Sequence, residues 1–174
     1  LMREQVDHCK QTLALLTARA GHLRAEGGAA VSARAWVEAV LAQWQAQRPH
    51  ATAILRAEPN LESVSIVADA TLAQALHTLV NNAADVSPDA VEVTARLAGG
   101  DLVFEVGDRG PGIPEALRAA LGSAPLQDRP AGMGIGLFLA QAAVGRYQGR
   151  LIFRARAGGG TLARMIIPLA GIQA

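Results

Sequence analysis

The stretch AVEVTARLAGGDLVFEVG, residues 90–107, decides the fold class, because it has the pattern of a β-hairpin. Apolar side chains alternate with polar ones over 90–97 and again over 101–107, which is the period of strands with one buried face. Gly99 and Gly100 stand between the two runs and supply the conformational freedom that a tight turn requires. We therefore predict two antiparallel strands joined at these glycines.

A second hairpin is predicted near the end of the sequence, from strands at 150–156 and 161–167 on either side of consecutive glycines. Because hairpins produce antiparallel strands, the sequence predicts an α+β domain: a two-layer sandwich of a mixed, largely antiparallel sheet with helices on one face. The other expected elements are strands at 51–57 and 64–68, helices at 32–48, 71–86, 114–121 and 134–147, and a loop at 122–132.

The composition allows one folded domain with a short appendage and excludes several classes of function. Of the 174 residues, 51% are hydrophobic, which is enough for a real core. Sixteen basic residues stand against fifteen acidic ones, so the charge of +1 indicates no surface for nucleic acid or anionic membrane. No apolar run of about 18 residues predicts a membrane span, and no secretion signal is visible. The single cysteine excludes an internal disulfide, and the lack of a Gly-Lys-Ser/Thr element excludes a P-loop.

The first residues have the heptad spacing of a coiled coil or helical bundle. We predict that residues 1–25 form a helix that packs on another chain or on a part of the protein outside this sequence. The alternative is an amphipathic helix that lies on the domain behind it. A glycine-rich hinge at 26–31 then leads to the domain proper, residues 32–174. The seam of the heptads would contain Met2, Val6, Cys9, Leu13, Leu16, Ala20 and Leu23.

The helix expected at 71–86 carries an unusual polar face. Exposed helix faces usually present Lys, Arg and Glu, whereas Asn and Thr are poor helix formers with short side chains. Their oxygens suit a Mg²⁺ ion that keeps several waters and takes substrate phosphates as further ligands. The alternative is a solvated face that carries these residues by chance. The polar face consists of Gln74, Thr78, Asn81, Asn82 and Asp85.

A second motif follows the first hairpin. Asp108 ends an apolar strand, and Gly110 and Gly112 come two and four residues later. A carboxylate at a strand end can accept a hydrogen bond from an exocyclic amine such as that of adenine, and glycines let the backbone approach a flat ligand. A plain turn that starts with aspartate is the alternative.

A third motif lies at the start of the helix expected at 134–147. Gly132, Gly134 and Gly136 occupy alternate positions before Leu137. Such a sequence leaves backbone N–H groups free to face an anion at the positive end of a helix. A glycine-rich helix start is by itself weak support for an anion site.

Together, these motifs resemble the ATP-binding domain of sensor histidine kinases, in the GHKL family that also includes gyrase, Hsp90 and MutL. Their order is the asparagine helix, Asp-x-Gly-x-Gly after a hairpin strand, Gly-x-Gly-x-Gly-Leu into a helix, and Gly-Gly-Thr at 159–161. The resemblance covers about residues 30–170, and residues 1–25 look like the end of the second dimerisation helix of such kinases. The run Arg-Glu-Gln-Val-Asp-His-Cys-Lys with the later Asn-Asn-Ala-Ala-Asp looks most like the RegB/PrrB-type redox sensor kinases.

The resemblance implies the Bergerat (GHKL) ATP-binding fold, with ATP and Mg²⁺ as cofactors. Asn82 would ligate Mg²⁺, and Asn81 and Asp85 would line the same pocket. Asp108 would hold the adenine amine. The rest of the nucleotide site would consist of Gly110, Gly112 and Ile113 around the base, Gly132, Gly134, Gly136 and Leu137 at the phosphates, and Thr161, which would help to fix the base through water.

Two departures from the family pattern bear on the chemistry. Thr78 stands four residues before Asn82, where most such kinases have asparagine and the ATP-hydrolysing relatives have glutamate as general base. Thr78 cannot be that base, which favours transfer of phosphate to a protein over hydrolysis. The lid region, 114–131, contains no phenylalanine or lysine, so Arg129 is the nearby base that could replace the usual lysine, and Arg109 is a poorer candidate.

The function that this resemblance implies is the ATP/Mg²⁺-binding catalytic domain of a two-component sensor histidine kinase. None of His8, His22, His50 and His77 has the context of a phosphoacceptor, so the acceptor histidine is expected before Leu1 and autophosphorylation is not expected from these residues alone. His77 is expected on a helix surface. The alternatives are an ATPase-like or anti-sigma-type GHKL protein, and a degenerate domain that acts as a non-catalytic nucleotide-sensing or protein-interaction module.

The resemblance also implies partners and a location. The expected partners are the protein's own dimerisation/phosphoacceptor domain, in a homodimer of the full protein, and a cognate response regulator, with no nucleic acid and no membrane contact. The expected location is the cytoplasm, with the full-length protein anchored in the bacterial inner membrane. Cys9 could be a redox switch, through an intermolecular disulfide or a sulfenate, or a small buried seam residue.

Overall fold

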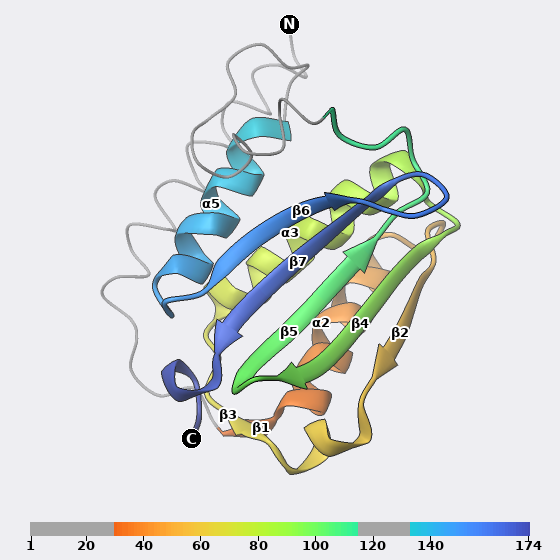
Figure 1. Ribbon diagram of the computed structural model, residues 1–174. Coiled ribbons are helices and arrows are strands. Elements are labelled where there is room, and N and C mark those ends of the chain that lie inside the picture. Colours follow the sequence, from red (N-terminus) through yellow and green to blue (C-terminus); the bar gives the residue numbers. More distant parts are fainter. Residues whose placement is uncertain (1–29, 115–132) are drawn as a thin grey trace, which may run out of the picture.

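A five-stranded sheet forms one layer of the protein in the computed structural model, which describes residues 30–114 and 133–174 (Figure 1). Its strands are β2 (Ala53–Ala57), β4 (Val91–Ala98), β5 (Asp101–Gly107), β6 (Arg150–Ala155) and β7 (Thr161–Pro168). Their order in the sheet is β2-β4-β5-β7-β6. β2 is parallel to β4 and the other neighbouring pairs are antiparallel, which confirms a mixed, largely antiparallel sheet built around two hairpins.

Helices cover one face of this sheet: α2 (Ala33–Gln47), α3 (Ala70–Val86) and α5 (Met133–Gly145). In Figure 1, α2 and α3 lie behind the sheet, and α5 lies beside α3 next to β6. The predicted two-layer α+β arrangement is therefore confirmed for the described residues. The predicted dimerisation segment 1–25, the helix over 114–121 and the loop over 122–132 lie outside them, apart from Pro114.

Side-chain caps begin the two helices whose starts the sequence marks most clearly. Ser32 accepts a hydrogen bond from the Ala35 amide at 3.1 Å and caps α2. Asp69 caps α3, because its Oδ1 accepts hydrogen bonds from the amides of Thr71 and Leu72 at 3.0 Å. Each cap satisfies amides that the first turn of a helix leaves without partners.

The core lies between the helices and the sheet. Leu72, Leu76 and Leu79 of α3 are at most 2% exposed and belong to one cluster with the inward side chains of the strands. Trp36 of α2 meets Phe104 of β5, with ring centroids 5.3 Å apart. Burial of each such side chain stabilises the fold by about 1.5–3 kcal/mol, so these contacts fix where α3 lies on the sheet.

The strand predicted at 64–68 is confirmed only over residues 65–66, and it does not belong to the large sheet. The chain leaves β2 through a 3₁₀ turn, η2 (Pro59–Ser63), and then forms only the two-residue strand β3 (Ser65–Ile66). β3 pairs with β1 (Val31–Ser32) in a separate small sheet. Within β3, Ile66 is buried, whereas its neighbours at 65 and 67 are exposed.

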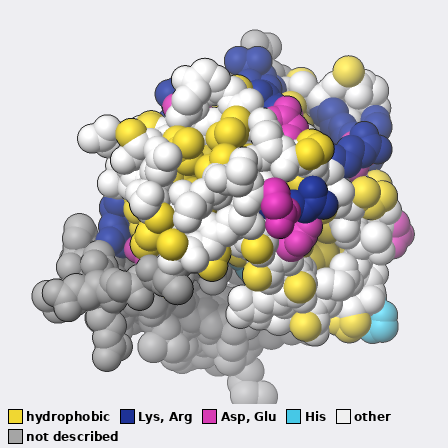
Figure 2. All heavy atoms as spheres, turned by 90° about the horizontal axis from the view of Figure 1, so that it is seen from below, with side chains coloured by type: hydrophobic (Ala, Val, Ile, Leu, Met, Phe, Trp, Pro, Cys, Tyr) yellow, Lys and Arg dark blue, Asp and Glu magenta, His cyan; other side chains and the backbone are white. Residues whose placement is uncertain are grey.

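The end of the molecule that carries β1, β3 and η2 is seen in Figure 2, where hydrophobic side chains gather between charged groups. Val31 and Val67 in this part of the chain are 38% and 36% exposed.

Among the helices of the described residues, none combines the length and apolar character needed to cross a bilayer.

Candidate functional site

A cavity of about 330 Å³ lies between α3, the sheet and the loop that follows β5. It brings together both residues on which the sequence interpretation depends, Asn82 of the helix and Asp108 of the loop. The remaining lining residues are mostly apolar: Leu79, Ala83, Val86, Val106, Pro111, Gly112, Ile113, Leu137, Phe153, Thr161 and Ala163. A cavity with apolar walls and a few well-placed polar groups is typical of a small-molecule site.

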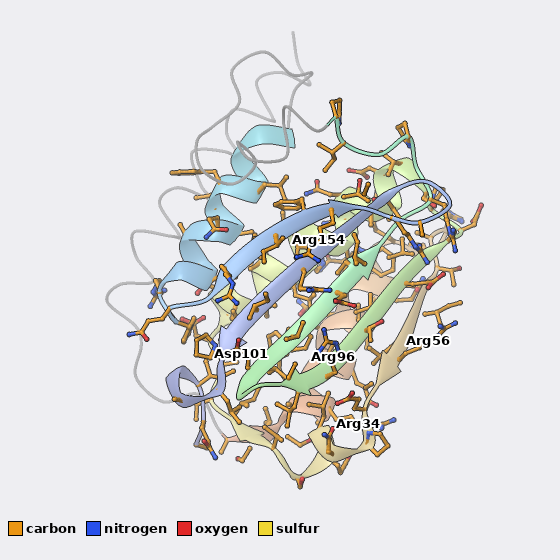
Figure 3. All side chains as sticks on the ribbon, viewed as in Figure 1. Arg34, Arg56, Arg96, Asp101 and Arg154 are labelled. Carbon is orange, nitrogen blue, oxygen red and sulfur yellow. The ribbon has the colours of Figure 1, made fainter. Side chains whose placement is uncertain are left out.

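Three neighbouring strands form an apolar wall of the cavity. Val106 of β5 is in register with Ala163 of β7, which is in register with Phe153 of β6. Arg154, one position along β6, projects from the opposite face, and Figure 3 shows it with Arg96 on the side of the sheet away from the helices. The period of two along the strands therefore separates an apolar wall from a charged outer surface.

The carboxylate of Asp108 is held firmly at one end of the cavity. Its side chain is 7% exposed, and Oδ1 accepts hydrogen bonds from the amides of Gly110 at 2.8 Å and Thr161 at 3.1 Å. Its own amide donates to the Thr161 carbonyl at 3.0 Å. No described residue donates to Oδ2, so this oxygen is available to accept from a ligand amine.

The backbone around Asp108 can pack this closely because two positions lack side chains. A Cβ at Gly160 would overlap the Asp108 carbonyl oxygen, and φ there is +96°. A Cβ at Gly110 would come within 2.7 Å of Val86 Cγ2. Gly112, with φ of +79°, lines the cavity itself. Glycine is therefore required at these positions by the close approach of the backbone, and its predicted role around a flat ligand stays a prediction.

Arg156, a residue that the sequence interpretation missed, fixes the loop from behind. Its Nη1 donates to the Asp108 carbonyl oxygen at 3.1 Å, and its Nη2 lies 2.7 Å from Glu92 Oε1. The hydrogen bond and charge of this guanidinium lower the pKa of the Glu92 carboxyl. Arg109, the poorer phosphate candidate, lies 4.0 Å from the same carboxylate, and Arg129 is outside the described residues.

Asn82 lies on the α3 wall of the cavity with an unsatisfied amide. Its Nδ2 is buried and has no hydrogen-bond partner among the described residues. Such an orphaned group usually marks a position where a ligand or water completes the hydrogen bonding. No cluster of three His, Cys, Asp or Glu side chains in the described ranges could hold a metal. The residues present therefore fit a Mg²⁺ ion only if phosphates and waters supply most of its ligands, as Mg²⁺ commonly requires.

The start of α5 closes another side of the cavity. Leu137 is 7% exposed and lines it, and Gly136 sits so close to α3 that a Cβ would lie 3.2 Å from Thr78 Cγ2. Gly134 is in the first turn of α5, whose leading amides have no partner within the helix. Gly132 lies outside the described residues.

Asn81 and Asp85 do not line this cavity, which corrects the expectation that they share it with Asn82. The Asn81 Oδ1 accepts from Trp44 Nε1 at 2.9 Å, and Asp85 Oδ1 lies 2.6 Å from Arg48 Nη2. Successive residues of a helix are turned by about 100°, so Asn81 and Asp85 face α2 while Asn82 faces the cavity. The polar stripe read from the sequence is two stripes with different neighbours.

His77, which was expected on the surface, is also turned toward α2. Its Nδ1 lies 3.0 Å from Asn81 Nδ2, and its Nε2 is buried without a partner among the described residues. Burial lowers the pKa of His77, and the charge of Arg48 lowers it further. A half-buried ring of this kind is not a free phosphate acceptor.

Comparison with known proteins agrees with this geometry. Residues 68–171 match the family described as histidine kinase-, DNA gyrase B-, and HSP90-like ATPase. The C4-dicarboxylate transport sensor protein DctS of Rhodobacter capsulatus is 32% identical over 113 residues, which are 64% of this chain and 17% of that protein. The chain thus spans about a sixth of the length of this relative. Because that relative is named for dicarboxylate transport, the finer resemblance to redox sensor kinases gains no support.

Solved structures share the fold at low sequence identity. The mycobacterial sensor histidine kinase MprB superposes with a TM-score of 0.64 at 22% identity, covering 82% of this chain and 97% of that one. Full-length ShkA in complex with AMPPNP gives a TM-score of 0.72 at 23% identity, covering 95% of this chain and 37% of that one. Since the family match spans more than half of the chain, the protein belongs to the family of histidine kinase-, DNA gyrase B- and HSP90-like ATPases.

Proposed function

We propose that the cavity binds ATP with Mg²⁺ and that the γ-phosphoryl group passes to a histidine outside residues 30–174. The observation that carries this proposal is that Asp108 and Asn82, 26 positions apart in the sequence, line one cavity. A base fits between the apolar wall of the sheet and the backbone of the loop, with its exocyclic amine at Asp108 Oδ2. The phosphates then extend toward Asn82 and the start of α5.

The adenine end would recognise its ligand mainly through shape and one directed hydrogen bond. The two amides on Asp108 Oδ1 hold the carboxylate in place, so no rearrangement is needed for Oδ2 to accept. An ionised acceptor makes a stronger hydrogen bond than a neutral one. A guanine would present a carbonyl oxygen at that position and would meet repulsion, so we expect adenine nucleotides to be preferred.

The phosphate end would depend on charge neutralisation. Mg²⁺, when bound with ATP, would reduce the charge of the phosphates, and Asn82 is the side chain placed to be its protein ligand. The leading amides of α5 would add donors at the positive end of that helix. Phosphoryl transfer needs positioning and electrostatic stabilisation more than covalent catalysis by the protein.

The residues around the cavity favour transfer over hydrolysis. Hydrolysis needs a base to orient water. Among the described residues that line the cavity, the carboxylate is that of Asp108, and its Oδ1 already accepts hydrogen bonds from two backbone amides. Thr78 Oγ1 donates to the Gln74 carbonyl at 2.9 Å and is no base. In the transfer, the bond between the γ-phosphorus and the bridging oxygen breaks, a bond to an imidazole nitrogen forms, and ADP leaves with the electron pair.

The acceptor and the signalling partners come into this proposal from the family. We propose that the protein's own dimerisation domain supplies the histidine, that a response regulator receives the phosphate, and that the full protein is anchored in the bacterial inner membrane. A redox switch at Cys9 stays a prediction from the sequence, because that residue lies outside the described ranges.

The test is transfer of labelled phosphate from ATP to a separately supplied dimerisation domain. Wild-type protein is expected to label the domain, and Asp108→Asn is expected to label it far more slowly. A domain that binds a non-hydrolysable ATP analogue but never transfers phosphate would support the second candidate, a non-catalytic nucleotide-sensing module. Two features of the sequence favour that candidate: Thr78 stands where most such kinases have asparagine, and the lid region 114–131 contains no phenylalanine or lysine. If wild-type protein binds no adenine nucleotide, both are wrong and a pure interaction domain remains.

A further inference from the structure

A buried hydrogen-bond network joins the end of α2 to α3, directly behind the cavity wall. Trp44 is fully buried, and its indole N–H, which can only donate, reaches Asn81 Oδ1 at 2.9 Å. The donor therefore fixes which way the Asn81 amide is turned. The other end of the amide, Nδ2, lies 3.0 Å from His77 Nδ1.

This orientation also determines the tautomer of His77. The Asn81 Nδ2 group donates, so His77 Nδ1 must accept, and the ring carries its proton on Nε2. A proton on Nδ1 would place two donors against each other. The lowered pKa of His77, which burial causes, agrees with a neutral ring. The Trp44 indole thus fixes the orientation of the Asn81 amide, and this amide in turn fixes the tautomer of the His77 ring.

Arg48, which follows α2, holds the same stripe of α3 at two further points. Its Nη1 donates to the Asn81 carbonyl oxygen at 3.3 Å, and its Nη2 lies 2.6 Å from Asp85 Oδ1. His77, Asn81 and Asp85 are spaced four residues apart, so they form one line along α3 that faces α2. These contacts add to the core packing of α3 and oppose its rotation about its axis.

We propose that Asn81, clamped by Trp44, is a positioning residue that sets the direction in which Asn82 points into the cavity. Asn82 follows directly on the same rigid helix, so any rotation of α3 that the hydrogen bonds of Asn81 permit moves the Asn82 amide by the same angle. Side-chain tips lie about 5–6 Å from a helix axis, so a turn of about 10° shifts them by about 1 Å. Displacements of about 1 Å at a reacting site can cost about a hundredfold in rate. The inference rests on the proposed Mg²⁺-ATP site.

The test separates the phosphate end from the adenine end. Binding of adenosine and of an ATP analogue with Mg²⁺ is measured on the full chain by calorimetry. Asn81→Leu removes the side-chain hydrogen bonds with Trp44, His77 and Arg48 at similar volume. Trp44→Phe removes the indole donor together with part of the buried ring. Both are expected to weaken Mg²⁺-dependent binding by about tenfold, with adenosine affinity unchanged within about twofold.

A conservative variant and a matched control sharpen the result. Asn81→Asp keeps an acceptor for Trp44 and can accept from a His77 tautomer protonated on Nδ1, so binding is expected within about threefold of wild type. Arg34→Ala disturbs only exposed ion pairs, with Glu38 of α2 and Glu62 of η2, and is expected to change the affinity for neither ligand. Nitrogen NMR of wild type is expected to show the Nε2–H tautomer at His77.

Other outcomes would overturn the proposal. Equal losses for adenosine and for the Mg²⁺ complex in Asn81→Leu and Trp44→Phe would show a structural role only, and unchanged binding in both would show no role. If wild-type protein binds neither ligand, the proposed function itself fails, and this inference fails with it. Wild-type binding with unaffected variants would overturn this inference alone.

Discussion

The two ends of the cavity are built in different ways. At the proposed adenine end, backbone amides and close-packed glycines surround Asp108, and Oδ1 already accepts hydrogen bonds from two amides before any ligand arrives. At the proposed phosphate end, Asn82 Nδ2 is buried without a partner among the described residues, and we propose that the direction of this amide depends on the contacts of α3 with α2. If the proposed function holds, this comparison means that recognition of the base is preorganised, whereas recognition of the phosphates is completed by the ligand and its cation.

The largest expected effect comes from adding one methyl group at the adenine end. Gly160→Ala places a Cβ on the Asp108 carbonyl oxygen at a φ of +96°, so we expect a loss of about 3 kcal/mol or more in the free energy of unfolding. Gly159→Ala is the matched control, because φ is +102° but nothing lies within 4 Å of its Cβ. Strain alone should cost about 1–2 kcal/mol there. Urea unfolding measures both, and equal losses would show that the close packing around Asp108 is not required.

Asp108→Asn should weaken binding at the adenine end whether or not Mg²⁺ is present. The substitution keeps an acceptor for the two amides but removes the charge and can turn a donor toward the base. Loss of a hydrogen bond to a charged group costs about 1.5–3 kcal/mol, so adenosine affinity should fall by about 10–150-fold. Calorimetry with adenosine measures this effect. An unchanged affinity would show that the base does not bind at this end of the cavity.

Asn82→Ala should show the opposite dependence on the cation. We expect affinity for an ATP analogue to fall by about tenfold with Mg²⁺ and to stay within about twofold of wild type in EDTA, because the variant removes only a metal ligand. The same titration in both buffers measures the difference. An equal loss in both would make Asn82 a direct contact of the nucleotide and remove the distinction between the two ends.

The smallest expected effect concerns pH and the network behind the phosphate end. Burial holds the pKa of His77 below 6.5, so the unfolded state takes up a proton first and stability falls as pH drops through that value. The pKa of Asp69 is lowered below 3.8 and that of Glu92 below 4.5, so these carboxylates lose their contribution to stability only at lower pH. Between pH 7.5 and pH 5.5, the free energy of unfolding should therefore fall more for wild type than for His77→Gln. Equal losses would show that the ring lies in a solvent-like environment.

Much of the adenine end could be predicted from the sequence, and less of the phosphate end. Alternating apolar residues fixed the hairpins, and an aspartate at a strand end followed by glycines is a local signal that does not depend on distant packing. The polar stripe of α3 was different, because only the position of α2 decides which of its residues face a cavity. Trp44 and Arg48 draw Asn81 and Asp85 away from Asn82, and no local pattern predicts that pairing.

Phe153 and Arg156 show the same limit. Both lie in or directly after β6, and they reach the site only because β6 pairs with β7 and β7 with β5. The register of strands far apart in the sequence was needed to place them. The small sheet of β1 and β3 was missed for a related reason, since its strands have two residues each and no period to detect.

The most direct test of a single shared site is a crystal structure with a non-hydrolysable ATP analogue and Mn²⁺ in place of Mg²⁺. The adenine amine should lie within hydrogen-bonding distance of Asp108 Oδ2, and the anomalous signal of the manganese should lie at coordination distance from Asn82 Oδ1. A nucleotide bound on another surface, or a metal ion far from Asn82, would contradict the placement of base and cation in one cavity.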